Sequence, residues 1–98
     1  MKSGCYILYD EERNLFKIGC SKNIENRIKT VMNTCEFCGI KSKLQVFNIV
    51  YVKNYMLFEK HLHLLASKYK YKNEWFKCGQ DEMNMVLFKI GSLDYYNK

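Results

Sequence analysis

Five polar side chains in this 98-residue sequence have the chemical types that phosphodiester hydrolysis requires, and they lie beside apolar stripes. They are Tyr6, Lys17, Arg27, Glu59 and His63. A carboxylate can hold a divalent metal, an arginine can neutralise charge that develops on a phosphate, and a tyrosine or lysine can take a proton from water. If the five converge on one surface, their chemistry suits cleavage of a phosphodiester bond.

Each of these residues also has an ordinary structural explanation. A strand tyrosine is usually half-buried, and a strand lysine faces solvent or protects a sheet edge. Glu59 and His63, four residues apart, can be a solvated pair on a helix, and Arg27 can snorkel along the helix that carries it. The hypothesis therefore depends on the whole set rather than on any one member.

Apolar and β-branched residues predict the strands that would carry Tyr6 and Lys17. Residues 5–9 and 15–20 form two strands joined by the polar loop 10–14. Residues 44–52, rich in Val, Ile, Phe and Tyr, form a third strand that we expect to be central, and residues 74–76 a short extended piece.

The register of the first hairpin decides whether two of the candidate residues meet. If the hairpin folds about Glu11 and Glu12, Tyr6 lies directly opposite Lys17. A slip of one residue would put the two side chains on opposite faces of the sheet.

Three other stretches show helical spacing of apolar residues. Their expected bounds and end signals are residues 24–32 after Ser21 or Asn23, residues 55–69 after Asn54, and residues 81–90 before Gly91. Arg27 borders the buried face of the first helix, and Glu59 and His63 flank the apolar stripe of the second. The order of elements predicts an α+β fold in which helices pack on a small, mostly antiparallel sheet.

Composition narrows the class of protein. The chain carries 16 basic and 10 acidic residues, a net charge of +6, which favours partners that bear phosphate, although it can equally serve solubility. Apolar runs are too short for a membrane span, and the first residues do not form a secretion signal. Five scattered cysteines indicate a reducing intracellular compartment, cytoplasm or nucleus. The absence of proline and the abundance of Lys and Asn suggest an A·T-rich genome, such as that of a large DNA virus, and for a viral protein the compartment would be the host-cell cytoplasm.

The order and spacing of the whole set resemble the GIY-YIG nuclease domain. Gly4-Cys5-Tyr6 occupies the place of the first tripeptide, Lys17-Ile18-Gly19 that of the second, and Arg27 that of the helix arginine. Residues 59–63 and Glu74-Trp75-Phe76 look like the E-x-x-x-H and EWF ending of a subgroup common in phages and large DNA viruses. The resemblance covers residues 3–76 within one domain, 1–98, whose residues 77–98 form a C-terminal helix and tail.

The resemblance implies a three-stranded, mainly antiparallel sheet flanked by helices, and an endonuclease that cleaves DNA with Mg²⁺ or Mn²⁺ held by Glu59. Tyr6 would contact the water or act in proton transfer, Arg27 would stabilise the pentavalent phosphate, and His63 would bind a phosphate oxygen or orient a neighbour. Lys17 stands where the family usually has tyrosine, so either Lys17 or Tyr6 could be the general base.

The same resemblance assigns supporting roles. Gly4 and Gly19 belong to the two tripeptides, and Gly19 would allow a close backbone approach at the strand-to-helix turn. Glu74 and Trp75 would finish the core rather than do chemistry. The family's late asparagine has no clear equivalent, unless Asn73 or Asn84 supplies it.

Four lysines are candidates for contacts with the DNA backbone: Lys22, Lys68, Lys70 and Lys72. Three of them alternate with tyrosines, a pattern that suits contacts with the DNA backbone charge and stacking on bases, whereas the alternative is a solvated helix end.

The expected partner is duplex or branched DNA, which the protein would cut with weak specificity for sequence or for DNA structure. We expect no membrane as a partner, and the sequence leaves homodimerisation open. The main alternative is a DNA-binding or adaptor module of the same fold that does not cut; a third is a protein-interaction domain.

Cys35 and Cys38 form a C-x2-C pair that could contribute to a zinc site. Zinc needs two further ligands, for which His61, His63 and Cys78 are the candidates. The alternative is that these cysteines are free thiols.

Overall fold

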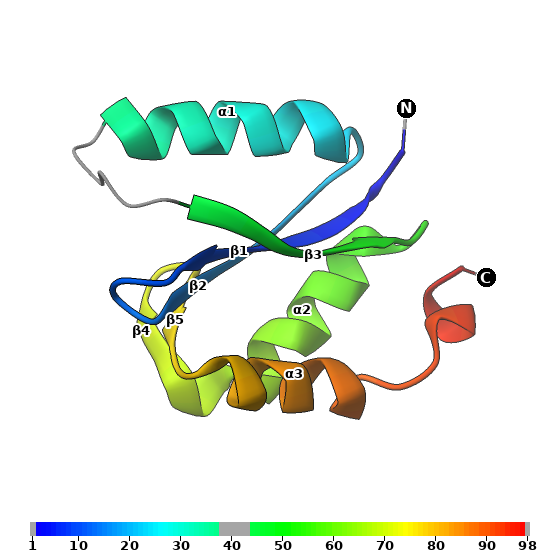
Figure 1. Ribbon diagram of the computed structural model, residues 1–98. Helices are drawn as coiled ribbons and strands as arrows, with labels where there is room; N and C mark the ends of the chain where they lie inside the picture. Colours follow the sequence, from blue (N-terminus) through cyan, green and yellow to red (C-terminus); the bar gives the residue numbers. More distant parts are fainter. Residues whose placement is uncertain (1, 38–43, 98) are drawn as a thin grey trace.

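The computed structural model describes residues 2–37 and 44–97. Its elements are β1 (Gly4–Asp10), β2 (Leu15–Ser21), α1 (Ile24–Phe37), β3 (Leu44–Tyr51), α2 (Tyr55–Leu65), β4 (Lys70–Lys72), β5 (Trp75–Lys77) and α3 (Gln80–Lys89), with 3-10 turns at Ser67–Tyr69 and Leu93–Asn97. The strands form one antiparallel sheet in the order β3-β1-β2-β5-β4. Helix α1 lies on one face, and α2 and α3 lie on the other (Figure 1).

The α+β class is confirmed, whereas two details of the predicted sheet are wrong. The sheet in the described residues has five strands rather than three, because the Lys70–Lys77 segment forms a short hairpin that adds β5 and β4 beside β2. Strand β3 is at an edge rather than in the centre. It returns to pair with β1, whose other side is already occupied by β2, so the inner strands are β1, β2 and β5.

The larger apolar core lies between the sheet and the two helices α2 and α3. Phe58 and Leu62 of α2 are buried there against Phe16, Ile18 and Phe76 of the sheet. Helix α3 begins at Gln80, one residue before the predicted start, and the Glu82 carboxylate accepts a 2.8 Å hydrogen bond from the backbone N–H of Gly79. None of the helices in residues 2–37 and 44–97 is long and apolar enough to cross a bilayer.

A smaller cluster lies under α1. Ile24, Ile28 and Val31 line its buried face, as the helical spacing predicted, and pack on Tyr6 and Leu8 of β1. At the start of the helix the Ser21 hydroxyl accepts a 3.0 Å hydrogen bond from the N–H of Asn23. Helix α1 therefore covers the face of the sheet that carries Tyr6.

The register of the β1–β2 hairpin differs from the prediction by two residues. Tyr6 pairs with Gly19, and Lys17 pairs with Leu8, because the turn is centred one residue later than expected and Asn14 closes it with a positive φ of 53°. A shift of two residues preserves the face. Tyr6 and Lys17 therefore still lie on the same side of the sheet, as diagonal rather than direct neighbours.

Candidate active site

The candidate site lies at the end of β2 where the pairing with β5 stops. Strand β5 pairs with β2 at residues 15–17, and the N–H of Ile18 donates to the backbone oxygen of Glu74 at 3.1 Å. From Gly19 to Ser21 the strand pairing in the described residues continues with β1 alone. Side chains from both faces of the sheet can therefore meet around this end of β2.

Tyr6 occupies this end of the sheet through its contact with Gly19. Its side chain is 1% exposed, and its ring and hydroxyl lie directly over the Gly19 backbone, where any Cβ would overlap them. Gly19 lies within β2 rather than at the strand-to-helix turn, so the close approach that it allows is that of the tyrosine ring. Gly4 serves the sheet itself, since a Cβ there would overlap the backbone of Val50 in β3.

Arg27 extends from α1 to the Tyr6 hydroxyl. Burial raises the pKa of Tyr6, and the nearby Arg27 guanidinium opposes part of that rise by hydrogen bonding and positive charge. The carboxylates of Glu74 and Glu59 add to the rise in the pKa of Tyr6. The phenol therefore stays protonated at neutral pH, which makes it a hydrogen-bond donor beside a cation rather than a tyrosinate.

Glu59 approaches the same end of β2 from the opposite face of the sheet. Burial raises the pKa of the Cys20 thiol to about 12, and the charge of Glu59 and its hydrogen bond with that thiol contribute to the rise. Glu59 is half-buried on α2, and its charge acts on both Tyr6 and Cys20. Cys20, a residue for which the sequence predicted no role, therefore lies beside the candidate metal ligand.

Lys17 forms an ion pair with Glu74. The sequence predicted a core role for Glu74 instead. The Lys17 ammonium lies 2.8 Å from the Glu74 carboxylate and 5.5 Å from the centre of the Trp75 ring. Trp75 packs against the cluster under α1, but the Glu74 side chain is 43% exposed and acts electrostatically on Tyr6. The turn at Asn73, whose φ is 54°, brings Glu74 to the edge of β2. The EWF motif marked this glutamate in the sequence, but as a core residue rather than as a partner of Lys17.

His63 is not joined to the other candidates by a hydrogen bond or an ion pair within the described residues. It lies one turn after Glu59 on α2, and its ring meets Phe76 edge to face at 5.1 Å. Its Nε2 is buried without a hydrogen-bond partner in the described residues.

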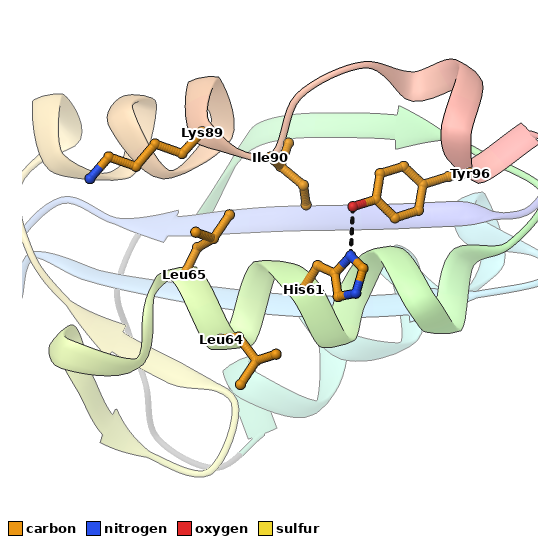
Figure 2. A pocket seen from close by; sticks show the side chains of 6 residues that line it. All are labelled: His61, Leu64, Leu65, Lys89, Ile90 and Tyr96. Atoms are coloured by element: carbon orange, nitrogen blue, oxygen red, sulfur yellow. Dashed lines mark hydrogen bonds between the residues drawn. The ribbon is translucent and has the colours of Figure 1, made fainter.

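The other histidine of α2, His61, lies in a pocket of about 280 Å³ between α2 and α3 (Figure 2). Its Nδ1 is 2.7 Å from the Tyr96 hydroxyl.

The four lysines predicted to contact DNA are all exposed: Lys22, Lys68, Lys70 and Lys72. Lys22 lies between β2 and α1, next to the candidate site, whereas the other three lie in or beside β4 at the far edge of the sheet. Their contact with DNA stays a prediction. Of the two candidate asparagines, Asn73 forms the β4–β5 turn and Asn84 is exposed on α3.

The donor atoms at the site suit a hard divalent cation. Glu59 and Glu74 supply carboxylate oxygens, and Mg²⁺ in enzymes is commonly held by one or two carboxylates, with water and substrate phosphate completing the shell. Within residues 2–37 and 44–97, no three His, Cys, Asp or Glu side chains form a group that could hold a metal by themselves. The predicted zinc ligand Cys38 and the side chain of Cys35 lie outside the described residues.

Comparison with known proteins shows the family of the chain. Residues 4–92 match the model of the T5orf172 domain. The chain belongs to the T5orf172 domain family. This is a phage- and virus-type domain of the homing-endonuclease class.

A viral relative also matches almost the whole chain. Uncharacterized protein 460R of Invertebrate iridescent virus 6 is 34% identical over 101 residues, which cover 99% of this chain. The chain spans 42% of the length of that relative. No solved structure matches this T5orf172 domain.

Proposed function

We propose that this T5orf172 domain is a metal-dependent endonuclease of the GIY-YIG type that hydrolyses DNA. The observation that carries the proposal is the meeting of Tyr6, Arg27 and Glu59 around one end of β2, although they come from β1, α1 and α2 and from both faces of the sheet. A tyrosine donor, a guanidinium and a carboxylate around one edge form a set that phosphoryl transfer uses.

Each residue then has a role that follows from its surroundings. Glu59 would hold Mg²⁺ or Mn²⁺, and the ion, when bound, would polarise the phosphate and activate water. Arg27 is exposed and would neutralise the charge that builds up on the phosphate. The protonated Tyr6 hydroxyl would donate a hydrogen bond to the attacking water or to a phosphate oxygen.

Lys17 and Glu74 would act together. Their ion pair is at the edge of the site, and a DNA phosphate would compete with the Glu74 carboxylate for the ammonium. Once released from Lys17, Glu74 would be a second carboxylate, with Glu59, that could help to hold the ion. His63, on the same face of α2 as Glu59, would orient that carboxylate, or would reach a phosphate oxygen if its ring turned to expose Nε2, which is buried without a partner in the described residues.

Cleavage of supercoiled plasmid by wild type and Glu59→Gln tests the proposal. We expect nicking with Mg²⁺ or Mn²⁺, none with chelator, and loss of nicking in the variant while DNA binding persists. The matched control is Asp81→Asn, which removes the same charge from an exposed residue on α3 and should cut like wild type.

The alternative, a DNA-binding module that does not cut, predicts a different pattern. Folded wild type would bind DNA, with an affinity that falls steeply as salt increases, but would cleave neither plasmid nor branched DNA in either metal. That result would overturn the nuclease proposal. A single strongly preferred recognition sequence cut by the monomer would overturn the weak specificity that we propose.

A further inference from the structure

A second hollow lies on the same face of the sheet as Tyr6 and Lys17. It has a volume of about 360 Å³, within the range of small-ligand pockets. It is lined by two groups of residues, one from the first hairpin and one from the second: Asp10, Arg13 and Leu15, and Tyr71, Lys72, Asn73 and Trp75. The pairs Asp10–Leu15 and Lys17–Trp75 place the floor of this hollow on the Tyr6 face.

The walls of the hollow combine aromatic rings with cations. Trp75 has the Lys17 ammonium 5.5 Å from its ring centre, and Tyr71, 62% exposed, has that of Lys77 at 6.0 Å. Arg13 and Lys72 add two further basic side chains at the rim. Aromatic rings beside basic side chains can bind a nucleotide, because its base stacks on the rings and its phosphate is attracted to the positive charges.

One wall is held rigid by a buried carboxylate and its ion pair. The Asp10 carboxylate is 1% exposed and lies 2.9 Å from the Arg13 guanidinium, and this contact also fixes the turn of the first hairpin. Opposite it, Asn73 turns the second hairpin with a φ of 54°. Two short turns of defined geometry therefore shape the hollow, which is already present in the folded domain.

The hollow adjoins the candidate site through Lys17. Lys17 pairs with Trp75 across the strands, and Gly19, beneath the Tyr6 ring, lies two residues farther along β2, about 7 Å away. A DNA strand with a phosphate at Tyr6 and Arg27 would thus bring a neighbouring nucleotide over Lys17 to the hollow. Only an unpaired nucleotide can offer the face of its base, since the faces of paired bases are stacked within the duplex.

We propose that this hollow binds one unpaired base of the DNA, so that the substrate class is DNA with single-stranded nucleotides next to the cut, such as a flap or overhang. The proposal rests on the proposed function for the position of the cut, but binding in the hollow can be measured without cleavage. Its occupant would stack on Trp75 and Tyr71, and Arg13 and Lys72 would contact the adjoining phosphates.

Trp75 provides a direct signal, because it is the single tryptophan of the sequence. In chelator, a duplex with a short overhang should change the Trp75 emission and bind more tightly than a blunt duplex of the same charge. An overhang whose bases are replaced by abasic sites keeps its phosphates, and should lose both the emission change and the extra affinity.

Tyr71→Ala should lower overhang affinity by roughly 5- to 150-fold, the range of one lost base stack, and leave blunt-duplex affinity unchanged. Tyr51→Ala is the matched control. Tyr51 is also exposed and also has a lysine over its ring, Lys2 at 5.1 Å, but it lies on β3 at the opposite edge of the sheet. The Tyr51→Ala variant should bind both the blunt and the overhang duplex as tightly as wild type does.

The outcomes separate this inference from the nuclease proposal. Equal binding of blunt, overhang and abasic duplexes, with plasmid still cut, would overturn the base-binding hollow and leave the nuclease intact. An overhang-dependent change in Trp75 emission that Tyr71→Ala abolishes, with no cleavage of any DNA, would support the hollow and overturn the nuclease. A Tyr71→Ala variant that loses blunt and overhang binding equally would also overturn the hollow.

Discussion

The two faces of the sheet differ in the side chains that they carry. Toward α2 and α3, inner-strand residues such as Ile7, Phe16 and Ile18 are buried in the larger apolar cluster. Toward α1, the same strands present Tyr6, Lys17 and Gly19, and the apolar cluster is smaller. The alternation of side chains along β1 and β2 therefore places the larger core on one face and Tyr6 and Lys17 on the other, while Glu59 reaches the candidate site from the core face.

Two tyrosines of β1 show the contrast at single-residue scale. Tyr9 stacks on Phe16 with ring centres 4.4 Å apart and donates to the Asn14 side chain at 3.2 Å. Tyr6, three residues earlier and on the other face, lies over Gly19 with its hydroxyl beside Arg27. Both rings are buried, so burial alone does not distinguish the structural tyrosine from the candidate functional one.

The largest effect should come from the core face. Phe58→Ala removes a ring that is 1% exposed and meets Tyr96 edge to face at 4.8 Å. We expect the free energy of unfolding to fall by about 3–5 kcal/mol, as measured by urea denaturation. An unchanged unfolding midpoint would show that the α2 face is not the main source of stability.

On the other face, Arg27→Ala should remove activity without unfolding the domain. The side chain is exposed, and we expect plasmid nicking to fall by about a hundredfold to a thousandfold, with little change in melting temperature. Lys29→Ala, also exposed on α1, is the control for loss of one positive charge and should retain nicking.

Tyr6→Phe and Tyr9→Phe compare the two tyrosines directly. A hydrogen bond to a charged group contributes about 1.5–3 kcal/mol, so Tyr6→Phe should slow nicking by roughly 10- to 150-fold. Tyr9→Phe should lose about 1 kcal/mol of unfolding free energy and keep its nicking rate. Equal nicking rates for the two variants would remove Tyr6 from the site.

Gly19→Ala should affect both properties, because its Cβ would overlap the Tyr6 ring. We expect a loss of about 1–3 kcal/mol from overpacking, together with slower nicking as the hydroxyl is displaced from Arg27. Gly79→Ala is the control, since its Cβ would make an ordinary contact with Glu82 at 3.4 Å. Unfolding curves and nicking rates of the same preparations provide the comparison.

The smallest change in unfolding free energy at neutral pH is expected from the thiols of Cys20 and Cys78. Burial raises the pKa of Cys20 to about 12 and that of Cys78 to about 11, from an ordinary value of 9.0. The folded state therefore holds these protons more tightly, so their contribution to stability is complete below about pH 9 and is lost as the pH rises toward 12. Cys20→Ala and Cys78→Ala should each flatten the fall in unfolding free energy over that range. An unchanged slope would show that burial of these thiols is not its cause.

Local patterns were sufficient to predict much of the fold. The strands at residues 5–9 and 15–20 and the stripe Ile24, Ile28 and Val31 were found from periodicity, because alternation and helical spacing are written in neighbouring residues. The β4–β5 hairpin was incompletely predicted. Its strands have three residues each, and strands so short become stable only when they pair with β2.

The residue types available for chemistry and their order, from Tyr6 to His63, are properties of the chain before it folds. Folding was needed to pair Tyr6 with Gly19, to bring Glu74 to Lys17, and to bring Glu59 round from the opposite face of the sheet. Each of these depends on a turn centre or on where β5 stops pairing with β2. Such features arise from contacts between residues distant in the chain, which no local spacing encodes.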